Sequence, residues 1–488
     1  MFSALQVTLR GSSMRQFLVR YGLMRVRATH GRRSGAVAVA WIGWRKQTRH
    51  VVELFDVSRV LSPWLVDMRN LLLLYGWLIL GSAASADWPQ FRGPDGQGHA
   101  EAVDLPTKWD EVRHVRWKRP VPGRGLSSPV IRGQQIWMTT AQEGGRSLRA
   151  LCFAADSGDL VQDVELFREA EAGPLHAKNS YATPTPVIGA ARVYFHFGMR
   201  GTAALSHQGE VLWKNDRLRY HQPYSAASSP VLFSDRLFLT CDGGDEQFVV
   251  AVNKQSGKVI WSTPRAHNEA ARVRARTEAR RGYATMAYST PLVVCANGEY
   301  QLVSPGADVV AAYDVKTGKE LWWYGYDGFS LVARPVFGHG LVYVVGVVEQ
   351  GRHELYAIRP ESRGQLKQED LVWRLTQNCP HVPSPLLIGG YLYLIRDNGV
   401  ASCVDAKTGG IEWQQRLGGN YSASPIYADG KIYCFSEEGK TTVLLPGPEF
   451  KRLAVNQLEG RILASPAVAE KALIIRTDTH LYSLQKEK

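Results

Sequence analysis

The sequence predicts an all-β protein, an eight-bladed β-propeller built from four-stranded antiparallel blades. Two recurring patterns support this fold class. A small polar residue followed by proline opens a run of β-forming residues, and a second motif, fullest at 312–322 (A-Y-D-V-K-T-G-K-E-L-W), ends shortly before most of these prolines. A repeat of roughly 40 to 60 residues is typical of propellers and solenoids. The prolines are Pro129, Pro186, Pro230, Pro291, Pro335, Pro385, Pro425 and Pro466.

One repeat contains the four strands of one blade. Between 288 and 322, β-forming runs occur at 292–295, 300–304, 309–314 and 319–322, which is the pattern of one antiparallel sheet. The pair Thr317-Gly318 lies between the third and fourth runs, where a tight turn favours a residue that tolerates positive φ. Gly257 and Gly409 have the same position in other repeats.

A large aromatic residue marks the fourth strand, and we expect it to pack between neighbouring blades. Seven such strands follow the prolines, and an eighth lies upstream, at Val115–Lys118 (V-R-W-K). The N-terminal strand is therefore expected to complete the last blade, which leaves no long exposed edge. The predicted docking residues are Trp117, Trp213, Trp261, Trp322, Trp373 and Trp413, with Phe167 and Leu453 in the two remaining blades.

The segment 312–322 resembles the docking motif of the pyrroloquinoline quinone (PQQ) repeat, which occurs in quinoprotein dehydrogenases and in BamB-type propellers of outer-membrane protein assembly. Segments 251–261 (A-V-N-K-Q-S-G-K-V-I-W) and 403–413 (C-V-D-A-K-T-G-G-I-E-W) are also similar to it. The resemblance covers about residues 112–488. It implies the fold but no single activity, because one fold hosts many functions. Residues 88–94 (W-P-Q-F-R-G-P) also look like the mature start of exported bacterial PQQ-like proteins.

The region before the propeller has the pattern of an export signal. Residues 68–86 combine one basic residue, an apolar run at 71–80 and a small-residue ending, which predicts cleavage after Ala86. The apolar run is too short to span a bilayer as a helix, so no permanent membrane anchor is expected. Residues 1–67 are interpreted as a mis-annotated or disordered extension, and 87–111 as a Gly/Pro-rich lead-in to a propeller at 112–488. The expected location is the periplasm or the cell exterior.

Charge and cysteine content exclude some functions. The chain carries 58 Lys and Arg against 45 Asp and Glu, but residues 1–86 contain 12 of the former and 3 of the latter. The remainder, at a net charge of +4, does not indicate nucleic-acid binding. The six cysteines form no C-x-x-C pattern, so neither haem attachment nor a compact zinc site is supported. Cys152 and Cys403 take the small position that Ala251 and Ala312 have elsewhere, which predicts buried free thiols.

The loops from each fourth strand to the next first strand are the candidate binding face. The interval is 12 residues from Trp413 to Pro425 but 30 from Trp261 to Pro291, and insertions of this kind map to one face of a repeat protein. Ordinary solvated loops are the alternative for each of their side chains. The candidate ligand-binding residues are Arg334, His176, Tyr181, His221 and His381.

Among these candidates, Arg334 replaces the Ser or Thr that precedes the repeat proline in seven blades. A guanidinium there could hold a carboxylate or phosphate, and an inter-blade ion pair is the alternative. No metal site is predicted. Asp242 and Asp245 are weak candidates for binding calcium, and the alternative is that they belong to an ordinary acidic turn. The run 268–281 predicts an Arg-rich surface helix capped by Asn268 or a flexible flap, either for an anionic partner or as a solvated insertion.

Two functions from different classes remain open. The first is a monomeric, non-enzymatic binding or scaffold protein that holds a protein or polymer, including an anionic glycan, on its loop face. The second is a PQQ-dependent alcohol or sugar dehydrogenase with PQQ and calcium as cofactors. Quinoprotein alcohol dehydrogenases typically enclose the quinone between a Trp and two adjacent cysteines, and this chain has no adjacent cysteines. The resemblance therefore favours binding over catalysis.

Overall fold

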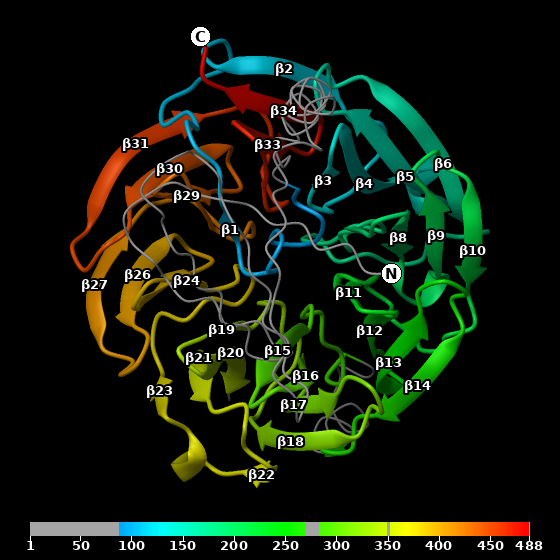
Figure 1. Ribbon diagram of the computed structural model, residues 1–488, viewed down its shortest axis with the longest axis vertical. Helices are drawn as coiled ribbons and strands as arrows, with labels where there is room; N and C mark the ends of the chain where they lie inside the picture. Colours follow the sequence, from blue (N-terminus) through cyan, green and yellow to red (C-terminus); the bar gives the residue numbers. More distant parts are fainter. Residues whose placement is uncertain (1–86, 270–272, 274–282, 349–351, 488) are drawn as a thin grey trace, which may run out of the picture. The chain divides into compact units, whose positions relative to one another are not determined.

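The computed structural model describes residues 87–269, 273, 283–348 and 352–487, which form an eight-bladed β-propeller (Figure 1). The predicted fold class is confirmed. The predicted extension and export signal, and most of the Arg-rich run 268–281, lie outside the described residues. Within the part of the chain that is described, no helix is long and apolar enough to cross a membrane.

Each blade is a four-stranded sheet whose first strand lies nearest the centre (Figure 1). Blades 1 to 4 contain β3 (Val130–Arg132), β4 (Gln135–Gln142), β5 (Ser147–Ala154) and β6 (Leu160–Arg168); β7 (Val187–Ile188), β8 (Arg192–His196), β9 (Thr202–Ser206) and β10 (Val211–Asn215); β11 (Val231–Phe233), β12 (Arg236–Asp242), β13 (Gln247–Asn253) and β14 (Val259–Pro264); and β15 (Leu292–Ala296), β16 (Glu299–Gly306), β17 (Val309–Asp314) and β18 (Glu320–Gly325). Blades 5 to 7 contain β19 (Val336–Gly338), β20 (Leu341–Val348), β21 (Arg352–Ile358) and β23 (Trp373–Leu375); β24 (Leu386–Ile388), β25 (Tyr391–Ile395), β26 (Val400–Asp405) and β27 (Ile411–Arg416); and β28 (Ile426–Ala428), β29 (Lys431–Phe435), β30 (Lys440–Leu445) and β31 (Lys451–Gln457).

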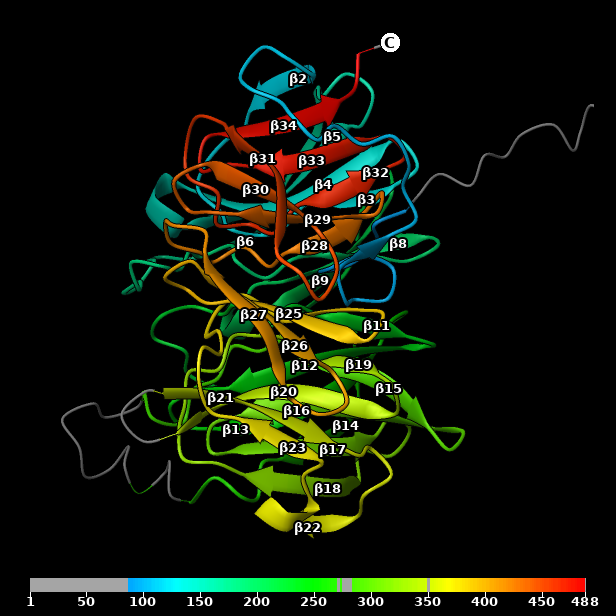
Figure 2. The same cartoon turned by 90° about the vertical axis from the view of Figure 1, so that its left-hand side faces the viewer.

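The eighth blade joins the two ends of the propeller. It consists of β32 (Ala467–Ala469), β33 (Ala472–Arg476), β34 (His480–Gln485) and, as its outermost strand, the N-terminal β2 (Val115–Pro120). Strand β2 pairs antiparallel with β34, with Trp117 opposite Ser483. Both views show the cyan β2 against the red β34 (Figures 1 and 2). The predicted N-terminal closure is confirmed, and it pairs an edge of β34 that would otherwise be open.

Two short strands extend blades beyond the repeat. Strand β1 (His99–Ala100), in the lead-in, pairs parallel with the inner strand β28 of blade 7. Strand β22 (Gly364–Leu366), in the insertion between β21 and β23, pairs parallel with β18 of the preceding blade. The lead-in is therefore attached to the inside of the propeller, and the insertion covers the outer edge of blade 4.

Four of the docking tryptophans connect their blade to the next one through a glycine turn. The Trp261 Nε1 donates a hydrogen bond to the Val315 carbonyl at 3.2 Å, in the β17–β18 turn. In that turn Gly318 has a φ of +74°, and a Cβ added to it would lie 2.6 Å from Cδ2 of Trp261. The turn therefore requires glycine for two reasons, its backbone conformation and the indole beneath it. The same Trp–Gly contacts join Trp117 to Gly158, Trp213 to Gly257 and Trp373 to Gly409.

Two of the predicted docking residues are wrong. In blade 1 the residue opposite the small Cys152 is Gln162, not Phe167, and Gln162 donates to the His207 carbonyl of blade 2 at 3.0 Å. In blade 7 the position falls on Ala454 rather than Leu453. The physical reason is that these two fourth strands carry no Trp to mark the position; the β-bulge beside it also occurs in blades that have the Trp.

Blade 7 obtains its missing indole from the lead-in. In four blades an aromatic residue of the second strand contacts the docking Trp, as Tyr393 contacts Trp413 with ring centroids 6.2 Å apart. The equivalent Tyr433 instead stacks on Trp109, at 6.2 Å and 25°. Trp109 is 4% exposed, and its backbone N–H donates to Asn456 Oδ1 of β31 at 3.0 Å. A residue outside the repeat thus fills the gap that Ala454 leaves.

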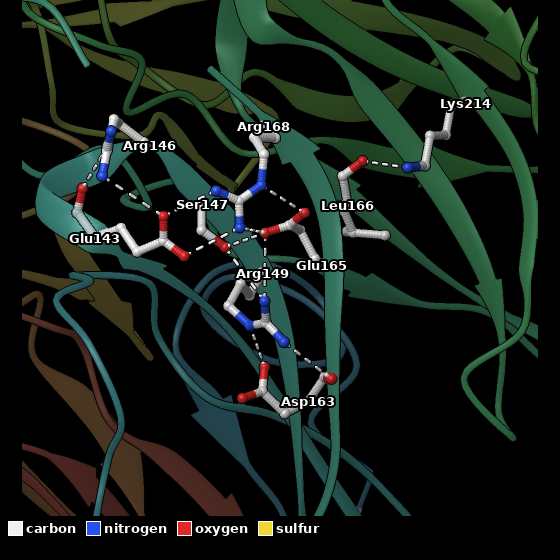
Figure 3. A network of polar contacts seen from close by, with 9 residues as sticks. All are labelled: Glu143, Arg146, Ser147, Arg149, Asp163, Glu165, Leu166, Arg168 and Lys214. Atoms are coloured by element: carbon white, nitrogen blue, oxygen red, sulfur yellow. Dashed lines mark hydrogen bonds and ion pairs between the residues drawn. The ribbon is translucent and has the colours of Figure 1, made fainter. Parts of the chain in front are cut away.

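Blade 1, which also lacks a docking Trp, carries a polar network across its outer strands (Figure 3). Arg149 contacts Asp163 at 2.5 Å, and Arg168 contacts both Glu143 and Glu165, at 2.8 and 2.7 Å. Lys214 of blade 2 donates to the Leu166 carbonyl and so reaches across to blade 1. Because these charges are partly exposed, each pair contributes little stability by itself.

Candidate functional site

A row of hydroxyl groups joins the inner strands around the central channel. The backbone N–H of Ser128 donates to Thr185 Oγ1 at 2.9 Å, Thr185 donates in the same way to Ser229, and Ser229 to Thr290. The row continues from Arg334 to Ser384, Ser424 and Ser465. Six of the seven Ser or Thr residues that precede a repeat proline are therefore explained by contacts between neighbouring blades.

A cavity of about 670 Å³ lies at the mouth of this channel, and all eight inter-blade connections contribute to its wall. The lead-in closes it from below. The lead-in bonds to residues that follow the hydroxyl positions along the inner strands. Trp88 pairs with Ile131, and the Ile188 N–H donates to the Pro89 carbonyl at 2.7 Å. The dark blue chain crosses the centre in Figure 1. Phe91, from this segment, lines the cavity at its floor.

One fixed position in every repeat supplies residues to the cavity wall. Because side chains alternate along an extended chain, the residue three positions before each repeat proline faces the same side as the residue just before that proline. All eight residues at this position line the cavity: Leu126, Thr183, Ala227, Tyr288, Val332, Val382, Ser422 and Leu463. Counting back from the repeat prolines could have identified them.

Aromatic rings gather on one side of the cavity. Tyr224 and Tyr283 stack with centroids 4.6 Å apart and an interplanar angle of 12°, and His176 contacts Tyr224 edge-on at 5.8 Å. Tyr288 and Phe329 line the same cavity. Large flat rings bury apolar area at low conformational cost, which makes them effective contact residues.

A histidine pair lies on another side. His381 lines the cavity, its Nε2 contacts the Ser330 carbonyl at 2.7 Å, and its ring stacks on His353 at 4.5 Å. Burial lowers the pKa of His353 to about 4, with a smaller contribution from His381. The backbone N–H groups of His381 and Val382 donate to the two carboxylate oxygens of Asp397. This carboxylate, in the β25–β26 turn, is therefore already engaged by the connection that leads into β24.

The five predicted ligand residues are not all brought together. His176 and His381 line the cavity, whereas Tyr181, His221 and Arg334 are not among its lining residues. The Tyr181 hydroxyl donates to the Gly173 carbonyl at 2.6 Å, and His221 is exposed, with its backbone N–H bonded to Asp245. Whether these residues bind a ligand stays a prediction.

Arg334 lies deeper than expected, under the lead-in. Its side chain is 2% exposed, and its Nη1 donates to the Phe91 carbonyl at 2.8 Å. Burial lowers its pKa to about 10. The position was predicted at the channel mouth because the path of the lead-in across the channel is not visible in the repeat pattern.

Asp242 and Asp245, the weak calcium candidates, have other partners. Asp242 is 1% exposed and forms a bidentate ion pair with Arg265, at 2.6 and 2.9 Å. Asp245 accepts the backbone N–H groups of His221 and Glu246. Among the described residues, no group of three His, Cys, Asp or Glu side chains could hold a metal ion. All six cysteines are unpaired, and Cys152 and Cys403 are buried as predicted.

The comparison with known families agrees with the fold. The profile of the family described as outer membrane protein assembly factor BamB matches residues 149–362 and 352–445, more than half of the chain. The chain belongs to this family. Family relatives include BamB of Burkholderia pseudomallei strain K96243, 32% identical over 94 residues, and BamB of Yersinia pestis, 25% identical over 214 residues. These matches cover 19% and 40% of this chain, and 24% and 49% of the relatives, so the chain spans at most about half of their length.

Solved structures of similar fold include both functional classes. BamB from Moraxella catarrhalis has a TM-score of 0.52 at 11% identity, covering 76% of this chain and 97% of that chain. A europium-containing methanol dehydrogenase has a TM-score of 0.58 at 11% identity, covering 81% and 90%. The quinohemoprotein alcohol dehydrogenase from Comamonas testosteroni has 0.59 at 9%, covering 85% and 82%. At such identities the likeness shows the fold alone.

Proposed function

We propose that this BamB-like propeller is an exported, non-enzymatic binding protein that holds part of a protein partner in its mouth cavity. The observation that carries the proposal is the cavity itself: eight loops surround it, its rings are available for contact, and its hydroxyl row joins the blades. Membership of an assembly-factor family supports a protein as the partner. The predicted leader at 68–86 supports export, and mature protein is expected to begin at Asp87 on N-terminal sequencing.

The alternative, a PQQ-dependent dehydrogenase, does not fit the residues around this cavity. Such chemistry needs carboxylate oxygens for calcium and a carboxylate as proton acceptor. Asp397 is the single acid among the described lining residues, and backbone N–H groups occupy its oxygens. No Trp or Cys is among the described lining residues either.

Two variants that each introduce one Trp test the proposal. Ala227→Trp places an indole in the cavity, and Val161→Trp places one on an outer strand where Val161 is 54% exposed. After crosslinking in the native host, purified wild-type protein and the Val161→Trp variant should carry the same protein partner, and Ala227→Trp should lose it at an unchanged melting temperature. Loss of the partner in the Val161→Trp variant alone would show that the partner binds the outer strands instead. Capture of a glycan in place of a protein would contradict the proposed class of partner.

A direct assay separates binding from catalysis. The purified protein is titrated with PQQ and calcium, followed by absorbance, and then given a panel of alcohols and sugars with an artificial electron-accepting dye. We expect no turnover with any of them. Saturable PQQ binding with turnover would replace the proposal by the dehydrogenase.

A further inference from the structure

Three buried arginines surround the floor of the mouth cavity without a carboxylate partner. Arg92 is 1% exposed, and Arg334 and Arg476 are each 2% exposed. Among the described residues, no ion pair joins any of them to an acid, and their Nε atoms have no hydrogen-bond partner. Arg265 shows the contrast, since it is equally buried but has both oxygens of Asp242.

Each of the three lies directly behind the cavity surface. Arg92 follows Phe91, and Arg334 bonds to the Phe91 carbonyl. The Arg476 Nη1 donates to the carbonyl and the hydroxyl of Ser127, at 3.0 and 2.8 Å, between the lining residues Leu126 and Ser128. The three guanidinium groups therefore lie behind the residues that form the floor and the wall of the cavity.

The nearby acids do not balance these charges. Asp95 acts on both Arg92 and Arg334, but its carboxylate bonds to the His99 ring at 2.7 Å and is partly exposed. On the wall, Lys178 is paired with Glu437 at 3.1 Å, and Asp397 receives two backbone N–H groups. Burial lowers the pKa of Arg92 and of Arg476 to about 9, so both remain charged at neutral pH.

Keeping unpaired charges away from water is costly, and Arg92 also has a positive φ of 65°, a conformation that favours glycine. Strained groups of this kind are concentrated at functional sites, so they indicate a function for this region. Low-dielectric walls weaken screening and concentrate the field of such charges in a cleft.

We propose that the mouth cavity selects a ligand group that is both aromatic or apolar and anionic, through the field of Arg92, Arg334 and Arg476. This inference rests on the proposed binding role of the cavity. The part of the ligand that enters the cavity carries a carboxylate or another oxyanion next to a flat apolar group. The rings of Tyr224, Tyr283 and Tyr288 contact the apolar part, and the arginines act through the floor and wall without direct contact.

A matched pair of fluorescent probes tests it. Anilinonaphthalene sulfonate and phenylnaphthylamine share one ring system and differ in the sulfonate charge. The wild type should bind the sulfonate on the order of tenfold more tightly, because one unit charge at about 10 Å and an effective dielectric constant of about 20 has an effect of that size. Arg334→Met should clearly reduce this preference while Arg92 and Arg476 keep part of it, Arg334→Lys should keep it, and the exposed Arg416→Met should leave it unchanged.

The variant Ala227→Trp, which places an indole in the cavity, separates the possible failures. Binding of both probes should be weakened in this variant, which places them in the cavity. If the neutral probe binds there equally well and Arg334→Met changes nothing, the anion preference is refuted and the binding cavity stands. If neither probe responds to Ala227→Trp, this inference falls, and the crosslinking experiment decides the proposed function by itself.

Discussion

Replacing Gly318 with alanine isolates the contact that holds neighbouring blades together. Gly318 and Gly340 both have positive φ, at +74° and +72°, so an alanine costs about 1 to 2 kcal/mol of backbone energy at either position. They differ in their surroundings. A Cβ on Gly318 would lie 2.6 Å from the Trp261 ring, whereas nothing lies within 4 Å of one on Gly340. Overpacking of that kind costs about 1 to 3 kcal/mol more.

Urea unfolding of the two variants measures the difference. We expect Gly318→Ala to lower the free energy of unfolding by about 2 to 5 kcal/mol and Gly340→Ala by about 1 to 2 kcal/mol. In a Trp261→Ala background, the extra cost at Gly318 should fall because the clash with the ring has been removed and only the 2.8 Å contact with Thr263 Oγ1 remains. Equal effects of the two alanines in the wild type, or an extra cost that is undiminished without Trp261, would refute the docking role of this turn.

Four further predictions concern stability. Trp322→Ala should cost about 4 to 6 kcal/mol in urea unfolding, because a fully buried ring and a 2.7 Å hydrogen bond to Gln301 are lost, whereas the adjacent, partly exposed Trp323→Ala should cost about 1 kcal/mol; equal costs would contradict this. Trp109→Ala should cost about 3 to 5 kcal/mol although it lies outside the repeats, and a near-neutral result would remove it from blade 7. Deleting 87–120 should expose the edge of β34 and cause aggregation in light scattering; an unchanged melting temperature would refute the closure. Burial lowers the pKa of His196 to about 4, so stability should fall as the pH drops from about 6.5 towards 4, by up to about 1.4 kcal/mol per unit, and His196→Asn should flatten that slope; an unchanged slope would contradict it.

The repeat pattern was enough to predict the fold, and the deviations have local causes. The proline and Trp-Gly signals predicted eight blades and the N-terminal closure because each reflects an obligatory contact: the hydroxyl row at the prolines, and the indole under the turn glycine. Gln162 and Ala454 were missed because a small or polar residue at the docking position leaves no sequence marker, although the backbone there has the same bulge as the Trp-containing blades. Trp109 was not recognised because its partner Tyr433 is more than 300 residues away in the chain.

The candidate site was predictable in part. The loop face and the cavity residues His176 and His381 came from loop lengths and residue type. The lining positions three residues before each repeat proline follow from strand alternation alone and were within reach. Arg334 was expected at the mouth, and no repeat pattern could show that Phe91 and Arg92 cross the channel above it. The lead-in has no repeat pattern, so its contacts with distant parts of the chain become visible only in the folded structure.

The central claim is that a protein partner enters the cavity at the loop face. The most direct measurement is photo-crosslinking in the native host, with benzoylphenylalanine in place of Tyr224, which lines the cavity, or of Leu212, which is 42% exposed on an outer strand. We predict one protein adduct from the Tyr224 position, which disappears when Ala227→Trp is added, and none from Leu212. Adducts from Leu212 alone, or a Tyr224 adduct that Ala227→Trp leaves unchanged, would contradict the account.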